Sequence, residues 1–187
     1  ARAGCARLMA RAVAFLGSIN VGGNRLKMAD LTSALAAAGL AQVETVTASG
    51  NVLFDPQGRS AKEAEALIAE TLADRFGLDV LVTVRSRDEV VSAIAQNPFQ
   101  GEGEDRFVHT HFLEGQPTQV QFDRLVADHA ERGSEKLSLG ERMLFLDYGD
   151  GVAESKLTGA FMERRLESRG TARNMRSLKR ILEKMEA

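Results

Sequence analysis

Four short polar clusters contain the residues best suited to hold a ligand: Ile19 to Gly23, Ser49 to Asn51, Ser155 to Leu157, and Thr171 to Asn174. Each cluster lies at the predicted end of a strand or helix and contains glycine, serine, threonine or asparagine. The backbone amides or short side chains of these residues can bind an anion. Two clusters add a cation, so that charge and free backbone donors could face one ligand. We therefore predict a site for a phosphate-bearing ligand, a nucleotide or an RNA segment. The predicted ligand-binding residues are Asn20, Gly22, Gly23, Ser49, Asn51, Ser155, Lys156, Arg173 and Asn174.

Each cluster also has a purely structural interpretation. A Gly-Gly pair often only makes a turn, and Ser49-Gly50-Asn51 is typical of a hairpin. Ser155 and Asn174 could simply cap helices, with Arg173 paired to a carboxylate or a carbonyl. The segment around Gly22 lacks the Gly-Lys-Ser/Thr of a P-loop, and it is no Gly-x-Gly-x-x-Gly fingerprint.

The histidines give a weaker indication of chemistry. His109 and His111 are two residues apart in a predicted strand, so they share a face, and His129 lies on the apolar side of the next helix. Together they could meet at a metal, but a histidine on an apolar helix face is more often packed and hydrogen-bonded. We predict no metal site and no cofactor. No Gly-x-Ser-x-Gly elbow is present, and no carboxylate spacing indicates an acid/base pair.

Charge and composition limit the class of protein. The chain has a net charge of −2, but its first 29 residues and the stretch from Lys156 to Lys184 are both basic. Such asymmetry can mark an anion-binding surface, although solvated helix faces explain it as well. The single Cys5 excludes an intrachain disulfide and suits a reducing cytoplasm. No apolar run approaches the length of a membrane span, so we expect a cytoplasmic protein without a membrane partner. Met9 could be the natural start, which would make residues 1–8 an extension.

Hydrophobic periodicity and turn residues define the expected elements. Capping boxes at Ser60, Ser86 and Thr118 indicate helix starts, because each is followed three residues later by Glu or Gln. The expected strands are 11–19, 43–47, 52–54, 80–85, 107–113, 136–139 and 143–148. The expected helices begin at Met28, Ser60, Ser86 and Thr118, span 157–168, and end with one capped by Asn174.

The first half thus has the order βαββαβ, which is typical of a ferredoxin-like unit. The second half reads βαββα followed by a helix, without an obvious final strand. We predict an α+β protein of two ferredoxin-like subdomains in tandem, the second modified and ending in a helix. The predicted boundaries are a tail at 1–10, a first subdomain with its connecting helix at 11–99, a linker at 100–105 and a second subdomain at 106–187.

The polar clusters also carry a resemblance to a known family. In order, the chain has Gly17-Ser18-Ile19-Asn20-Val21-Gly22-Gly23, Met28 to Leu31, Ser49 to Phe54, Ser155 to Leu157, and Thr171 to Met175. This order and spacing resembles the bacterial domain of unknown function 1697 family. Gly17 and Ser18 replace that family's Arg-Gly, and Met175 replaces its Trp. The resemblance implies an α+β fold of two related subdomains and no established activity.

Three hypotheses about function follow. The first is a binding module in which the N-terminal Gly/Asn loop, Lys156 and Arg173 converge on one basic surface. The second is an enzyme acting on a phosphorylated or carboxylated metabolite, with Lys156 as electrophile or acid. In the third, a structural or interaction protein, the motifs only join the subdomains, and burial of Lys156 and Arg173 in intramolecular ion pairs at the junction would favour it. The sequence leaves the ligand and the oligomeric state open.

Overall fold

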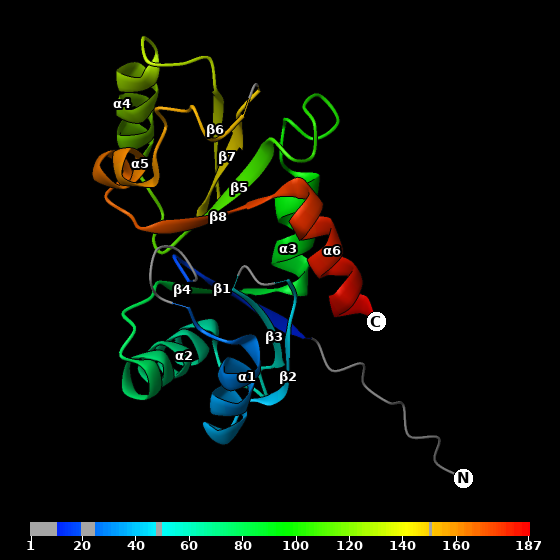
Figure 1. The fold of residues 1–187 in the computed structure, drawn as a ribbon. Coiled ribbons are helices and arrows are strands. Elements are labelled where there is room, and N and C mark those ends of the chain that lie inside the picture. The colour runs from blue at the N-terminus through cyan, green and yellow to red at the C-terminus, as the bar shows by residue number, and fades with distance from the viewer. Residues whose placement is uncertain (1–10, 20–24, 48–49, 150) are drawn as a thin grey trace.

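A computed structural model describes residues 11–19, 25–47, 50–149 and 151–187 of the chain. Its described part is mixed α+β, with two four-stranded antiparallel sheets and six helices (Figure 1). Strand order is β2-β3-β1-β4 in the first sheet and β6-β7-β5-β8 in the second. The sequence-based expectation of an α+β fold is therefore confirmed.

The N-terminal unit runs from β1 to α3. Strands β1 and β3 are buried along their whole length, so both faces of the sheet are covered there. Helix α2 begins with the Ser60 capping box and ends at Gly77, whose left-handed φ of 64° suits glycine. The elements are β1 (Ala12–Leu16), α1 (Met28–Ala37), β2 (Ala41–Thr45), β3 (Asn51–Asp55), α2 (Ala61–Phe76), β4 (Val82–Ser86) and α3 (Arg87–Ala95).

The C-terminal unit repeats this order from β5 to α6. Thr118 and Gln121 form the capping box that begins α4, and Asn174 caps α6 by accepting from the Ser177 amide at 2.8 Å. The elements are β5 (Val108–Leu113), α4 (Gln119–His129), β6 (Lys136–Gly140), β7 (Met143–Asp147), α5 (Gly159–Leu166), β8 (Gly170–Asn174) and α6 (Met175–Glu186).

The main correction to the sequence-based elements is β8. The sequence predicts a turn and a helix start near Arg173, whereas the structure places this residue in a strand paired with β5. The segment contains one β-branched residue, Thr171, beside residues of low strand propensity, so its pattern carries no strand signal. Pairing with β5 supplies the stabilisation that local propensity lacks. Helix α5 is also shorter than the predicted 157–168.

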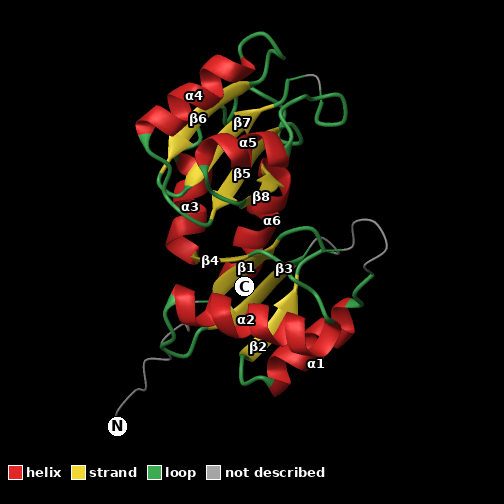
Figure 2. Ribbon diagram, turned by 90° about the vertical axis from the view of Figure 1, so that its left-hand side faces the viewer, coloured by secondary structure: helices red, strands yellow, loops and turns green. Residues whose placement is uncertain are grey.

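Three hydrophobic clusters hold the layers together. One lies between the first sheet and helices α1 and α2, and another between the second sheet and helices α4 and α5. Figures 1 and 2 show these helix pairs on the outer sides of the two sheets. The third cluster joins the inner faces of both sheets with α3 and α6, and we call it the junction core. It contains Phe15, Leu53, Phe112, Phe145 and Leu178.

Candidate functional site

Arg173 is the predicted site residue with the most extensive contacts. It lies on β8 and is 8% exposed, in the junction core beside the first sheet. Its Nη2 donates to Leu16 O at 2.9 Å and Gly50 O at 3.3 Å. Its Nη1 donates to Thr171 Oγ1 and Ala172 O, both at 2.8 Å. Arg173 is therefore a cross-link between the two units rather than a surface cation.

Asn51 completes this cluster from the N-terminal unit. Its Oδ1 accepts from Arg173 Nε at 2.5 Å, and its Nδ2 donates to Val46 O at 3.1 Å. The two side chains thus fix the last residue of β1 to the turn before β3. These are the flanks of the loops that carry four other predicted residues. Those four, Asn20, Gly22, Gly23 and Ser49, lie outside the described residues.

Burial changes the electrostatics of this cluster without removing its charge. Desolvation lowers the pKa of Arg173 to about 10. The guanidinium therefore stays protonated at neutral pH, and its positive charge lies beside the carbonyls of Leu16 and Gly50.

Ser155 and Lys156 lie on the other side of the second sheet. Ser155 Oγ donates to Glu135, whose second oxygen is 2.9 Å from His129 Nε2. His129 packs edge-on to Phe161, which belongs to the cluster under α4 and α5. Lys156 is exposed on the loop between β7 and α5. The structure therefore brings Arg173 and Asn51 together but does not bring Lys156 beside them.

Glu135 organises this second cluster. Burial alone would raise the pKa of Glu135, but hydrogen bonds from Ser155, from its own backbone amide and from His129 lower it overall. Ser155 in turn accepts from the Leu157 amide at 3.1 Å. The carboxylate thus fixes the loop that carries Lys156 to the end of α4, which is a structural role. The expectation that His129 is packed and hydrogen-bonded is confirmed.

His109 and His111 share a face of β5, as expected from their spacing. His111 is 6% exposed, and burial lowers its pKa to about 4, with His109 and Arg173 adding repulsion. Its Nδ1 is buried without a hydrogen-bond partner in the described part of the chain. Among these described residues no group of three His, Cys, Asp or Glu is placed to hold a metal ion.

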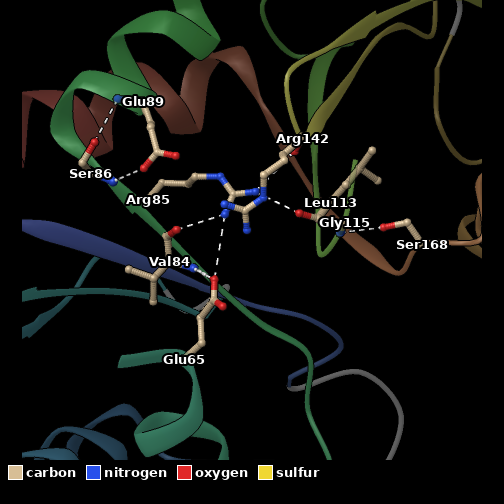
Figure 3. A network of polar contacts seen from close by, with 9 residues as sticks. All are labelled: Glu65, Val84, Arg85, Ser86, Glu89, Leu113, Gly115, Arg142 and Ser168. Atoms are coloured by element: carbon tan, nitrogen blue, oxygen red, sulfur yellow. Dashed lines mark hydrogen bonds and ion pairs between the residues drawn. The ribbon is translucent and has the colours of Figure 1, made fainter. Parts of the chain in front are cut away.

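Arg85 is a residue that the sequence did not single out. It precedes the cap of α3 as Arg173 precedes the cap of α6, and it reaches across the junction in the opposite direction. Its Nη2 donates to Leu113 O at 2.9 Å and to Arg142 O at 3.3 Å (Figure 3). Each unit thus contributes one buried arginine to backbone carbonyls at the matching strand ends of the other.

Two phenylalanine rings connect these arginines. Phe15 and Phe112 stack with centroids 4.3 Å apart and planes 13° from parallel. Arg85 lies over Phe112 at 5.6 Å and Arg173 over Phe15 at 5.4 Å. A guanidinium over a ring face gains cation–π attraction, more so where water is excluded. The reciprocal arginine clasp is our name for Arg85, Phe112, Phe15 and Arg173.

Comparison with known proteins places the chain in a family. A family model described as "Protein of unknown function (DUF1697)" matches residues 9–145. The chain belongs to the DUF1697 family. A conserved bacterial protein from Streptococcus pneumoniae has a similar solved structure, with a TM-score of 0.72 and 20% identity over 96% of this chain and 99% of that chain. At this identity the likeness shows the fold alone.

Neither comparison brings a described activity. No curated protein matches the chain significantly. In the residues that the structure describes, no helix is long and apolar enough to cross a membrane.

Proposed function

We propose that this member of the DUF1697 family is a cytoplasmic binding module for a phosphate-bearing ligand, a nucleotide or an RNA segment. In this proposal Asn20, Gly22, Gly23 and Ser49 bind the ligand, and Asn51 and Arg173 hold the chain segments that flank these residues in the sequence. The observation that carries the proposal is the hydrogen bonding of Arg173 to Leu16 O and Gly50 O. It supports the proposal because Leu16 comes shortly before the first polar cluster in the sequence, Gly50 belongs to the second, and Arg173 belongs to the fourth.

Arg173 has a positioning role in this proposal. Its Nε, Nη1 and Nη2 atoms already donate to protein acceptors, so its contribution to the ligand is its buried charge and the fixed loop ends. Glycine amides in the loop would supply the direct hydrogen bonds to phosphate. Ser155 and Lys156 form a separate candidate contact, and Asn174 acts through the cap of α6.

A structural or interaction protein is the second candidate, and one observation favours it. Arg173 is buried at the junction of the two units, where its donors cross-link the chain. In that case Asn51 and Arg173 serve folding alone. The enzyme hypothesis depends on Lys156, which forms no ion pair with any described residue. Such a role needs a titratable group beside the lysine, and no ion pair supplies one among the described residues.

A thermal-shift panel with phosphate, sulfate, nucleotides and short RNA tests the proposal. A ligand that binds the native state raises the unfolding temperature by mass action. We expect a shift in the wild type that is lost in an Asn20→Ala/Ser49→Ala variant. Lys156→Ala, measured in parallel, shows whether the separate contact participates. If no anion shifts the wild type, or the loop variant keeps the full shift, the binding module is wrong.

The order of elements supports a finer description of the fold. We propose that both units are ferredoxin-like subdomains in tandem, with boundaries at 11–99 and 106–187 around a linker at 100–105. In each unit the last strand lies beside the first, in the orders β2-β3-β1-β4 and β6-β7-β5-β8. Strand β8 supplies the final strand of the second unit, which the sequence had not revealed.

A further inference from the structure

A groove lies at the Arg85 end of the reciprocal arginine clasp, and its lining includes none of the predicted site residues that the structure describes. Its volume is about 500 Å³, and both units contribute to its walls. The polar side chains among its lining residues are Lys62, Glu65, Asp79, Glu114, Arg142 and Arg169. Alanines of α2 and the segment entering β4 complete the walls. A volume in this range is typical of small-ligand sites.

The charges in this groove are unevenly paired. Glu65 is occupied, since it accepts from the Val84 amide at 2.8 Å and lies 4.0 Å from Arg85 Nη1 (Figure 3). Arg169 Nε is 3.4 Å from Glu114. Lys62 and Arg142 have no ion pair in the described part of the chain. Two cations are thus available to an anion, and one further carboxylate, Asp79, is available to a donor.

Arg142 is held for this role by the clasp. Its carbonyl accepts from Arg85, and its amide donates to Gln116 Oε1 at 2.5 Å. Its backbone has a left-handed φ of 51°, which non-glycine residues seldom adopt. Burial first, and then the charge of Arg142, lower the pKa of Arg85. The charge of Arg142 thus disfavours the charged form of Arg85, and an anion bound to Arg142 would relieve that repulsion.

The residues that line the groove also limit which chemical groups the ligand can have besides its phosphate. It includes no aromatic residue, so there is no platform on which a nucleobase could stack. Aliphatic residues, such as Ala66 and Val82, form the rest of the walls. Asp79 is a pure acceptor, suited to hydroxyl donors. The cations and carboxylates nearly balance, which gives no field that would attract a polyanion such as RNA.

We infer that this groove is a second binding site, and that its ligand is a small phosphorylated polyol of the sugar-phosphate class. Arg142 and Lys62 bind the phosphate, and Asp79 accepts hydrogen bonds from hydroxyl groups. Arg85 is a positioning residue that fixes the turn carrying Arg142. The lining residues of this groove are all different from the ligand-binding residues of the proposed function, so variants at Arg142 and at Asn20 test the two proposals separately.

Titration calorimetry on the full chain tests this site, with glucose 6-phosphate, ribose 5-phosphate, glucose and inorganic phosphate as probes. We expect a sugar phosphate to bind more tightly than inorganic phosphate, and unphosphorylated glucose to give no binding. Loss of one charge-assisted contact weakens binding by roughly tenfold or more. We expect this weakening in both Arg142→Gln and Lys62→Gln. The second variant changes only an exposed helix residue and should leave folding intact.

The control is Arg164→Gln, which removes the same charge from an exposed position of α5 whose guanidinium contacts its own helix. It should leave sugar-phosphate binding unchanged. Absence of binding in the wild type, or equal weakening in all three variants, overturns the site. Nucleotide or RNA binding that depends on Asn20 while no sugar phosphate binds would overturn this inference alone. Sugar-phosphate binding that depends on Arg142 but not Asn20 would support it alone.

Discussion

At the scale of single residues, the burial of His111 makes the stability of the folded state depend on pH. The folded state lowers its pKa from 6.5 to about 4, because burial disfavours the charged ring. The unfolded state therefore binds more protons between these values, and stability falls as pH decreases from about 6.5 to about 4. The shift corresponds to roughly 3 kcal/mol of unfolding free energy at full effect. Urea unfolding at several pH values measures this loss.

His111→Gln provides the comparison for that measurement. The variant removes the titrating group, so its stability should depend less steeply on pH across the same range. His109, whose pKa burial also lowers, retains part of the slope in both proteins. An identical pH dependence in wild type and variant would contradict the assignment to His111.

The residues of the candidate site were only partly accessible from sequence. The pattern of Thr171 to Asn174 marked Arg173 as notable, yet nothing local showed that its donors reach the other half of the chain. The sequence did not indicate a role for Arg85, since an arginine at the end of a strand, just before a helix cap, is common on protein surfaces. Both roles arise from the packing of two sheets, which local periodicity does not encode.

At the scale of elements, the sequence located best the helix starts that a capping box sets. The capping boxes at Ser60, Ser86 and Thr118 all form as predicted, because each needs only four successive residues. Strand β8 escaped prediction because its stabilisation comes from pairing with β5 and from burial of Thr171 and Arg173. A single sequence predicts least well those strands whose stability comes from residues far away in the chain.

The close packing of β8 gives a prediction at this scale. A Cβ on Gly170 would lie 2.5 Å from the His111 ring and 2.9 Å from Leu113 Cδ2. Gly170→Ala should therefore lower the free energy of unfolding by about 1–3 kcal/mol, since the neighbours must shift. Gly159→Ala is the matched control, because a Cβ there meets nothing within 4 Å. Chemical denaturation measures the free energy of unfolding of both variants. A Gly170→Ala variant as stable as Gly159→Ala would refute the predicted clash.

At the scale of the whole molecule, the junction core makes the two units one folding entity. Neither inner sheet face is covered without the other, as Phe15, Phe112 and Phe145 are all nearly inaccessible. Each arginine of the clasp satisfies carbonyls of the opposite unit. Loss of either leaves buried acceptors unpaired, which costs more than the hydrogen bonds themselves. We therefore expect unfolding of one unit to expose the other.

The composition of the chain allows this cooperativity to be measured directly. Tryptophan is absent and Tyr148 is the only tyrosine, so intrinsic fluorescence reports on the C-terminal unit, while circular dichroism reports on both. The two probes should give coincident urea transitions in the wild type. Arg85→Met and Arg173→Met should each lower the midpoint, by about 2–4 kcal/mol in unfolding free energy, and keep the probes coincident. Lys179→Ala, which loses an exposed ion pair with Asp105, should change stability little.

Separate transitions in the wild type would show that the units fold independently. Arg85→Met would then destabilise only the unit that carries it, and the clasp would be a contact between finished domains rather than part of one core.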